Sequence, residues 1–282
     1  MNANTFKTYV LLAGLGGLLI LGGRFLFGGA GAFVGLLIGL IFVGGSYWFS
    51  DKIAVKAARA QPVTETQAPQ LYRIVRQLTT AANMPMPRLY VTPDMQPNAF
   101  ATGRNEDHAA VAVTQGIMQI LSEDELRGVL AHELAHVRNK DILIGSVAAA
   151  IAMGITFLVR MVMWGAMFSG GREDEGGNPF GMLAMALLAP IAAALLQMAV
   201  SRSREFEADA SGAALAGGGE PLARALEKLQ LGAQRVPMNV HPAQASMYIV
   251  NPLSGRRVSF AGLFSIHPPM EERIRRLRTW RP

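Results

Sequence analysis

Four long apolar runs interrupt the chain, and they constrain its fold more than any other feature. They cover residues 8–23, 25–50, 142–168 and 176–201, and only Arg160 is charged within them. An α-helix needs roughly 20 apolar residues to cross a lipid bilayer. We therefore expect four transmembrane helices, arranged as two hairpins.

The composition agrees with a protein that is partly outside water. Of its 282 residues, 51% are hydrophobic and 16% are charged, whereas soluble domains carry roughly 25% charged residues. The absence of cysteine excludes disulfides and thiolate metal ligands. A cleaved signal peptide ending near Ala-Arg-Ala at 58–60 is the competing explanation for the first run. Two apolar runs precede that site, however, and together they far exceed an apolar signal region of about 7–15 residues.

Basic side chains near the ends of the apolar runs predict the orientation in the membrane. If the four runs alternate in direction, most of these side chains share one side, which we expect to be cytoplasmic: Lys7, Lys52, Lys56, Arg59, Arg138, Lys140, Arg202 and Arg204. The polar blocks 51–141 and 202–282 then lie on that side and can form one domain, separated by the hairpins 1–50 and 142–201. The basic surplus of the second block suits an anionic lipid surface. Because no nucleic-acid motif accompanies this surplus, we expect no nucleic-acid partner.

The first polar block shows a mixed pattern of helices and strands. We expect a helix at about 67–82, strands at 88–92 and 109–114, and a short extended segment at 98–103. Ser122 and Glu125 form a capping box, which predicts the start of a long helix there. Its core-facing stripe contains Val129, Leu130, Leu134 and Val137. The predicted fold class is α+β and mostly helical, with four transmembrane helices and a small β-sheet.

The sequence His132-Glu133-Leu134-Ala135-His136 lies on this predicted helix. Residues four apart share a helical face, so the imidazoles of His132 and His136 can converge on one metal ion. Glu133 lies about 100° round the helix and can reach a water molecule at that ion as a general base. The alternative is a pair of surface histidines on an amphipathic helix.

A third metal ligand is expected from the second polar block. The ten-residue offset typical of a third histidine falls on Ile142, which excludes that arrangement. Asp141 is too close along the chain to fold back easily as a ligand. Glu205 and Asp209 share one helical face, while Glu207 points away as a solvated charge. We therefore predict Glu205 as the ligand and Asp209 as the carboxylate that holds a ligand histidine in place.

Four motifs resemble those of the HtpX family, which are bacterial membrane zinc metallopeptidases related to the eukaryotic CAAX prenyl proteases. They are HELAH at 132–136, SRSREFEAD at 201–209, NAFATG at 98–103 and HPPMEERIRRL at 267–277. The resemblance covers nearly the whole chain and implies a gluzincin fold with one Zn²⁺ per chain. It also implies cleavage of misfolded or damaged membrane proteins, that is, membrane-protein quality control. The expected location is the bacterial inner membrane, with the active site and both termini in the cytoplasm.

The resemblance also implies roles for residues outside the metal ligands. His267 matches the family's transition-state histidine; it could instead occupy a fourth metal position at rest or simply cap the following helix. Asn98, Ala99 and Phe100 resemble the edge strand that gluzincins offer to a polypeptide substrate, bound by strand addition. His108 and His241 lack any partnering pattern, and we expect both to be ordinary surface residues.

Two other classes of function remain open. One is a catalytically idle membrane scaffold that binds client proteins, against which the intact Glu133 argues. The other is a transporter or channel with an incidental motif. Since transport usually needs paired ionisable residues within the spans, the isolated Arg160 gives that reading little support.

Overall fold

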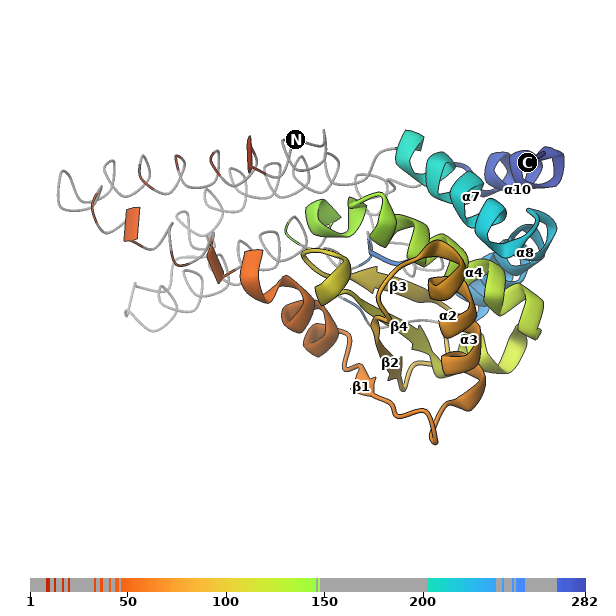
Figure 1. Cartoon of the computed structure of the whole chain (residues 1–282), viewed down its shortest axis with the longest axis horizontal. Helices are drawn as coiled ribbons and strands as arrows, with labels where there is room; N and C mark the ends of the chain where they lie inside the picture. Colours follow the sequence, from red (N-terminus) through yellow and green to blue (C-terminus); the bar gives the residue numbers. More distant parts are fainter. Residues whose placement is uncertain are drawn as a thin grey trace, which may run out of the picture.

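The computed structural model of the chain describes residues 47–145, 202–236, 247–251 and 268–282, with scattered positions elsewhere. Among these residues, no helix combines the length and the apolar character needed to cross a membrane. Most residues of the four predicted spans lie outside the described residues. What is described is a mostly helical α+β fold around a small mixed sheet (Figure 1).

The sheet has four strands in the order β1-β2-β4-β3. β2 and β4 are parallel neighbours, whereas β1 pairs with β2 and β3 pairs with β4 in antiparallel fashion. The strands cover Gln61–Pro62 (β1), Arg88–Thr92 (β2), Ala99–Thr102 (β3) and Ala110–Thr114 (β4). The predicted extended segments are confirmed to within about one residue, and β1 is an addition. β3 is one edge of this sheet, next to the fully buried β4.

Helices from the first polar block cover one face of the sheet. These are α2 (Pro69–Ala82), α3 (Gln115–Ile120) and α4 (Glu123–Arg138). A short 3-10 turn, Glu106–His108, lies between β3 and β4 in the sequence. The α4 helix begins at the predicted capping box: the Ser122 hydroxyl accepts the Glu125 N–H, and the Glu125 carboxylate accepts the Ser122 N–H. The predicted stripe of apolar α4 residues is buried in the main core, which confirms the direction in which that helix faces.

The opposite face of the sheet holds a second, smaller core. Alternate β3 and β4 residues, among them Phe100 and Ala112, point to this face because side chains alternate along a strand. They pack with Tyr248, with Ala54 of the helix at 47–57 (orange in Figure 1) and with Ala58 just after that helix. The sheet is therefore covered on both sides.

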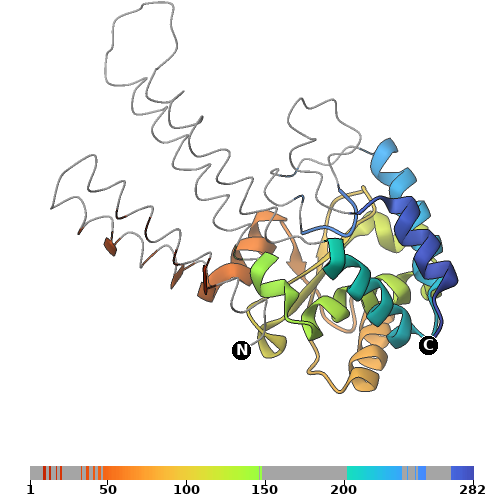
Figure 2. The ribbon, with the colours of Figure 1, turned by 90° about the horizontal axis from the view of Figure 1, so that it is seen from above.

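The second polar block packs against the first. Its helices are α7 (Arg202–Ala216), α8 (Glu220–Arg235) and α10 (Met270–Thr279). α4 contacts both α7 and α8, and α10 lies against α8 and α7 (Figure 2). Two glycines allow the close crossings: Gly128 of α4 lies against the backbone of Leu222, and Gly212 of α7 lies against the backbone of His132. The two blocks together build the region around His132.

Candidate metal centre

The two histidines of α4 face each other across one helical turn. The Nε2 atoms of His132 and His136 are 3.2 Å apart, and their rings meet edge to face with centroids 4.7 Å apart. His132 is buried, whereas His136 is partly open, with 16% of its side chain exposed. The helix period therefore brings both imidazoles to one point, as the spacing predicts.

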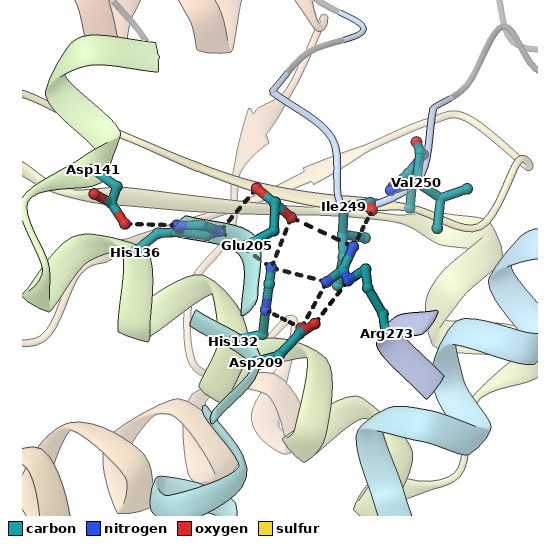
Figure 3. A network of polar contacts seen from close by, with 9 residues as sticks. His132, His136, Asp141, Glu205, Asp209, Ile249, Val250 and Arg273 are labelled. Carbon is teal, nitrogen blue, oxygen red and sulfur yellow. Dashed lines mark hydrogen bonds and ion pairs between the residues drawn. The ribbon is translucent and has the colours of Figure 1, made fainter. Parts of the chain in front are cut away.

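Glu205 brings a carboxylate from α7 to the same point. Its Oε1 lies 3.6 Å from His136 Nε2, and its Oε2 lies 3.9 Å from His132 Nε2. One ligand atom from each of these three residues lies within 4.8 Å of the others (Figure 3). Glu207, two residues further along α7, is exposed, as its place on the other side of the helix predicts.

A carboxylate contacts the Nδ1 atom of each histidine. Asp209 Oδ1 lies 3.0 Å from His132 Nδ1, and Asp141 Oδ2 lies 3.2 Å from His136 Nδ1. These contacts fix the ring orientations and leave Nε2 of each ring facing Glu205, which is how metal-binding histidines are usually arranged. Asp209 has the place that the sequence predicts for it.

Asp141 has a role that the sequence analysis missed. Its short distance along the chain predicts that it does not fold back easily as a metal ligand, yet its carboxylate lies beside His136. The preceding Lys140 has φ of +61°, in the left-handed region, so the chain makes a turn just after α4 ends. That left-handed turn, which sequence spacing does not reveal, returns Asp141 to the histidine. It lies at Nδ1, on the side of the ring away from Glu205.

Arg273 of α10 is a second residue that the sequence analysis missed. Its side chain is fully buried, and its Nε and Nη2 donate to Asp209 at 2.9 and 2.7 Å. Its Nη1 lies 3.4 Å from Glu205 Oε2 and donates to the Ile249 carbonyl at 3.2 Å (Figure 3). One signal could have found it: Arg273 lies four residues before the buried Leu277, on the apolar face of an otherwise basic helix.

The electrostatics of the site favour a positive charge between the histidines. Although burial opposes ionisation, the Asp141 and Glu205 carboxylates raise the pKa of His136 to about 9. Burial also opposes ionisation of Asp209, but Arg273 and His132 lower its pKa to about 2. For His132 itself burial dominates and lowers the pKa. Two imidazoles and a carboxylate in so negative a setting fit a divalent metal ion, with positions left for other ligands.

Glu133 lies beside this cluster without joining it. Its carboxylate is buried, and it accepts a hydrogen bond from the backbone N–H of Ala101 in β3. Burial raises the pKa of Glu133 to about 7, against the opposing effect of the His136 charge. Such a carboxylate can accept and return a proton near neutral pH.

Another segment of the chain lies along the stretch Asn98, Ala99 and Phe100, which the sequence predicts as the substrate-binding edge. The Ala99 carbonyl accepts the Ile249 N–H at 3.1 Å, and the Ala99 N–H donates to Asn98 Oδ1 at 3.1 Å. The Asn98 side chain also bonds both backbone groups of Val250. Phe100 points to the other face of the sheet, edge to face with Tyr248. A segment of the chain itself therefore occupies the start of this edge.

Of the three remaining histidines, the structure describes His108 alone; His241 and His267 lie outside the described residues. His108 closes a 3-10 turn, where its Nδ1 contacts Asn105 Oδ1 at 2.7 Å. The prediction describes it as an ordinary surface residue; in the structure it is half-buried and held by local contacts.

Comparisons with known proteins agree with this arrangement. The model of peptidase family M48 matches residues 65–281. A protein named Protease HtpX homolog from Syntrophobacter fumaroxidans is 55% identical over 279 residues, covering 97% of this chain and 98% of its own. Its namesake from Pelotomaculum thermopropionicum is 52% identical over 277 residues, with the same two coverages. The crystal structure of S. mikatae Ste24p aligns with a TM-score of 0.53 at 20% identity, covering 97% of this chain and 65% of that chain, and so supports the fold.

The buried ligand cluster, the adjacent glutamate and these similarities define a metallopeptidase, a hydrolase of peptide bonds. The chain belongs to peptidase family M48.

Proposed function

We propose that this chain is a zinc endopeptidase of the bacterial inner membrane, which cleaves misfolded or damaged membrane proteins at the cytoplasmic face. The observation that carries the proposal is the burial of the Glu133 carboxylate beside three ligand atoms that converge on one point. A scaffold that only binds clients has no use for an ionisable carboxylate buried there, because burial of such a group costs stability.

His132, His136 and Glu205 would hold one Zn²⁺ per chain. Two imidazoles and one carboxylate are a common protein ligand set for catalytic zinc, and they leave a position for water or substrate. When bound, the ion supplies a Lewis acid for the scissile carbonyl and lowers the pKa of a water molecule. Asp209 and Asp141 keep the two imidazoles in the orientation that binding requires.

Glu133 acts as the general base in this proposal. It takes a proton from the attacking water and returns it to the leaving amine, a double role that suits a pKa near neutrality. The Ala101 N–H fixes one side of the carboxylate while the reaction proceeds. We assign His267 to the developing oxyanion, which needs an additional hydrogen-bond donor.

The polypeptide substrate lies along β3 in this proposal, because backbone hydrogen bonds are independent of sequence and a quality-control protease accepts many sequences. The Ala101 N–H of this strand bonds Glu133, so the strand runs directly past the general base. A substrate that extends to Ala99 has to replace Ile249 at the Ala99 carbonyl. The proposed substrate edge is therefore shorter than the predicted stretch of Asn98, Ala99 and Phe100.

The membrane part of the proposal divides the chain into hairpins at 1–50 and 142–201 and catalytic parts at 51–141 and 202–282. Its support is the apolar sequence of the four runs and the surface where the first hairpin ends. Trp48 and Phe49 are 57% and 51% exposed. Arg104 lies over the Trp48 ring, 4.7 Å from its centroid, and Lys52 lies over the Phe49 ring, 5.4 Å from its centroid. Exposed aromatic rings beside basic side chains are typical of the membrane interface.

A Glu133→Gln variant tests the function most directly. The substitution keeps the shape of the side chain and leaves all three ligands in place. We expect zinc to stay at one per chain while cleavage of an unfolded, casein-like protein falls by roughly 10²–10⁴-fold. The inactive variant should also retain bound membrane proteins that it can no longer cut, which would identify the substrates.

Glu207→Gln is the matched control, because it removes an exposed glutamate from α7 and should cleave as fast as the parent. Undiminished cleavage by Glu133→Gln would exclude Glu133 as the base, whereas a zinc-loaded parent that binds clients without cleaving them would favour the scaffold. Bound clients that are soluble rather than membrane proteins would contradict the proposed substrate class.

A further inference from the structure

Arg273 connects the C-terminal helix to the candidate metal centre. We infer that Arg273 is a positioning residue: its two hydrogen bonds to Asp209 fix the carboxylate that orients His132. Metal retention would then depend on the packing of α10 against the site. The inference rests on the proposed role of His132 as a metal ligand. It adds a long-range requirement, because Arg273 lies 141 residues after His132 along the chain.

The geometry at Asp209 is specific. Arg273 Nε donates to Oδ2 at 2.9 Å, and Nη2 donates to Oδ1 at 2.7 Å, so both oxygens are engaged in a fork. Oδ1 also contacts His132 Nδ1 at 3.0 Å. One oxygen therefore serves both the guanidinium and the imidazole. Because the planar fork fixes the carboxylate plane, it also fixes the direction from which Asp209 meets the ring.

A lysine could supply the charge at this position but not the geometry. Its ammonium group is a point charge on a flexible stem, whereas the guanidinium matches a carboxylate along two parallel hydrogen bonds. Only Arg273 donates to both Asp209 oxygens among the contacts that the structure describes around this carboxylate. The proposal therefore predicts that Arg273→Lys is not a conservative change.

Stabilisation of the fold alone explains a buried arginine poorly. Removing a charged side chain from water is costly, and apolar residues of similar volume are often as stabilising as a buried ion pair. Ile274 and Leu277 already supply apolar contacts between α10 and the core. The positioning of Asp209 explains why the fully buried Arg273 guanidinium lies on the same face of α10 as these apolar residues.

The same guanidinium also holds the segment that lies on the β3 edge. Its Nη1 donates to the Ile249 carbonyl, and the Ile249 N–H donates to the Ala99 carbonyl. Arg273 therefore contacts both Asp209, which orients His132, and Ile249, which is bonded to β3. If α10 undocked, both would lose a partner together.

The test measures how fast zinc leaves the purified full-length protein in detergent when a chelating dye is added. Outer carboxylates and their partners typically change metal affinity by roughly 10–100-fold. We expect Arg273→Lys and Asp209→Asn each to speed zinc loss within that range while circular dichroism stays like the parent's. The inference places the effect of Arg273 in its two hydrogen bonds to Asp209 rather than in its longer 3.4 Å approach to Glu205, so the double variant should lose zinc no faster than the faster single variant.

Arg275→Lys is the matched control, since Arg275 is exposed on the same helix and pairs with Glu272. It should retain zinc like the parent. Parent-like zinc retention in Arg273→Lys overturns the inference. A double variant in which the two effects on zinc loss multiply also overturns it, because Arg273 would then act other than through Asp209. An Arg273→Lys protein that fails to fold while Asp209→Asn folds overturns it too, because Arg273 would then support the fold separately from Asp209. Zinc retained in Glu205→Gln would instead contradict the proposed metal site itself.

Discussion

Gly212 of α7 lies directly against the backbone of His132 in α4. A Cβ at position 212 would stand 2.9 Å from both the Cα and the N of His132. No side chain separates the two helices at this crossing. Glu205, Asp209 and Gly212 recur at positions i, i+4 and i+7, so one face of α7 carries the ligand, the orienting carboxylate and the contact surface.

Replacement of Gly212 by alanine should therefore damage the metal centre from a distance. The added methyl meets backbone, which cannot rotate away, so α7 has to shift and take Glu205 and Asp209 with it. We expect a loss of about 1–3 kcal/mol in stability, as for other overpacked sites, with weaker zinc binding. Thermal unfolding and zinc content of the purified variant would measure both. Gly218→Ala is the control, since a Cβ there meets nothing within 4 Å; equal zinc retention in the two variants would argue against this coupling.

Zinc content should separate two glutamates on the same helix. Glu205 faces the histidines, whereas Glu207 is exposed. Glu205→Gln replaces a charged ligand by a neutral one and should bind little zinc, while Glu207→Gln should keep one ion per chain. Metal analysis of both purified proteins decides between them. Equal zinc in the two variants would show that Glu205 is not the third ligand.

The start of α4 should contribute a pH-dependent share of stability. Glu125 accepts hydrogen bonds from the Ser122 N–H at 2.8 Å and from Lys228 Nζ at 2.7 Å. Although burial opposes ionisation, these donors hold the pKa of Glu125 below its ordinary value of 4.5. A carboxylate with a depressed pKa stabilises the fold above its unfolded pKa, and this contribution disappears as the pH falls through the folded value.

Glu125→Gln should thus lower the melting temperature at pH 7 by an amount that corresponds to roughly 1 kcal/mol, because Lys228 is partly exposed and solvent screens the pair. As the pH falls through the lowered pKa of Glu125, which lies below 4.5, the melting temperatures of the parent and the variant should converge, since protonation of the parent removes the same charge. Glu123→Gln serves as the control, because the Arg73–Glu123 pair is exposed on both sides. If the difference in melting temperature between the Glu125→Gln variant and the parent stays constant with pH, the charge of Glu125 contributes nothing to stability.

The proposed topology can be tested with single cysteines, because the chain has none of its own. Asn4→Cys, Asp174→Cys and Phe260→Cys place one thiol in each region of interest. A thiol reagent that cannot enter the cytoplasm should label only position 174 in intact cells, and all three positions should react after permeabilisation. Labelling at position 260 in intact cells would place part of the catalytic domain outside the cytoplasm and contradict the proposed topology.

The sequence by itself determined what one helix or strand can specify. The period of α4 brings His132 and His136 together, and the period of α7 separates Glu205 and Asp209 from Glu207. The strands at 88–92 and 110–114 are within a residue of their predicted bounds. These features depend on repeats of two or 3.6 residues, which hold wherever the element lies in the fold.

Only the tertiary structure decided the partners of the candidate site. Asp141 reaches His136 because the chain turns through a left-handed residue at Lys140. Arg273 reaches Asp209 because α10 docks beside α7, and the resulting fork compensates the cost of burying its charge. The segment at Ile249 lies on the β3 edge through a backbone hydrogen bond to Ala99 and the hydrogen bonds of the Asn98 side chain to Val250, a pairing of residues about 150 positions apart. Contacts between distant segments depend on how whole surfaces pack and lose water, and no local repeat encodes that.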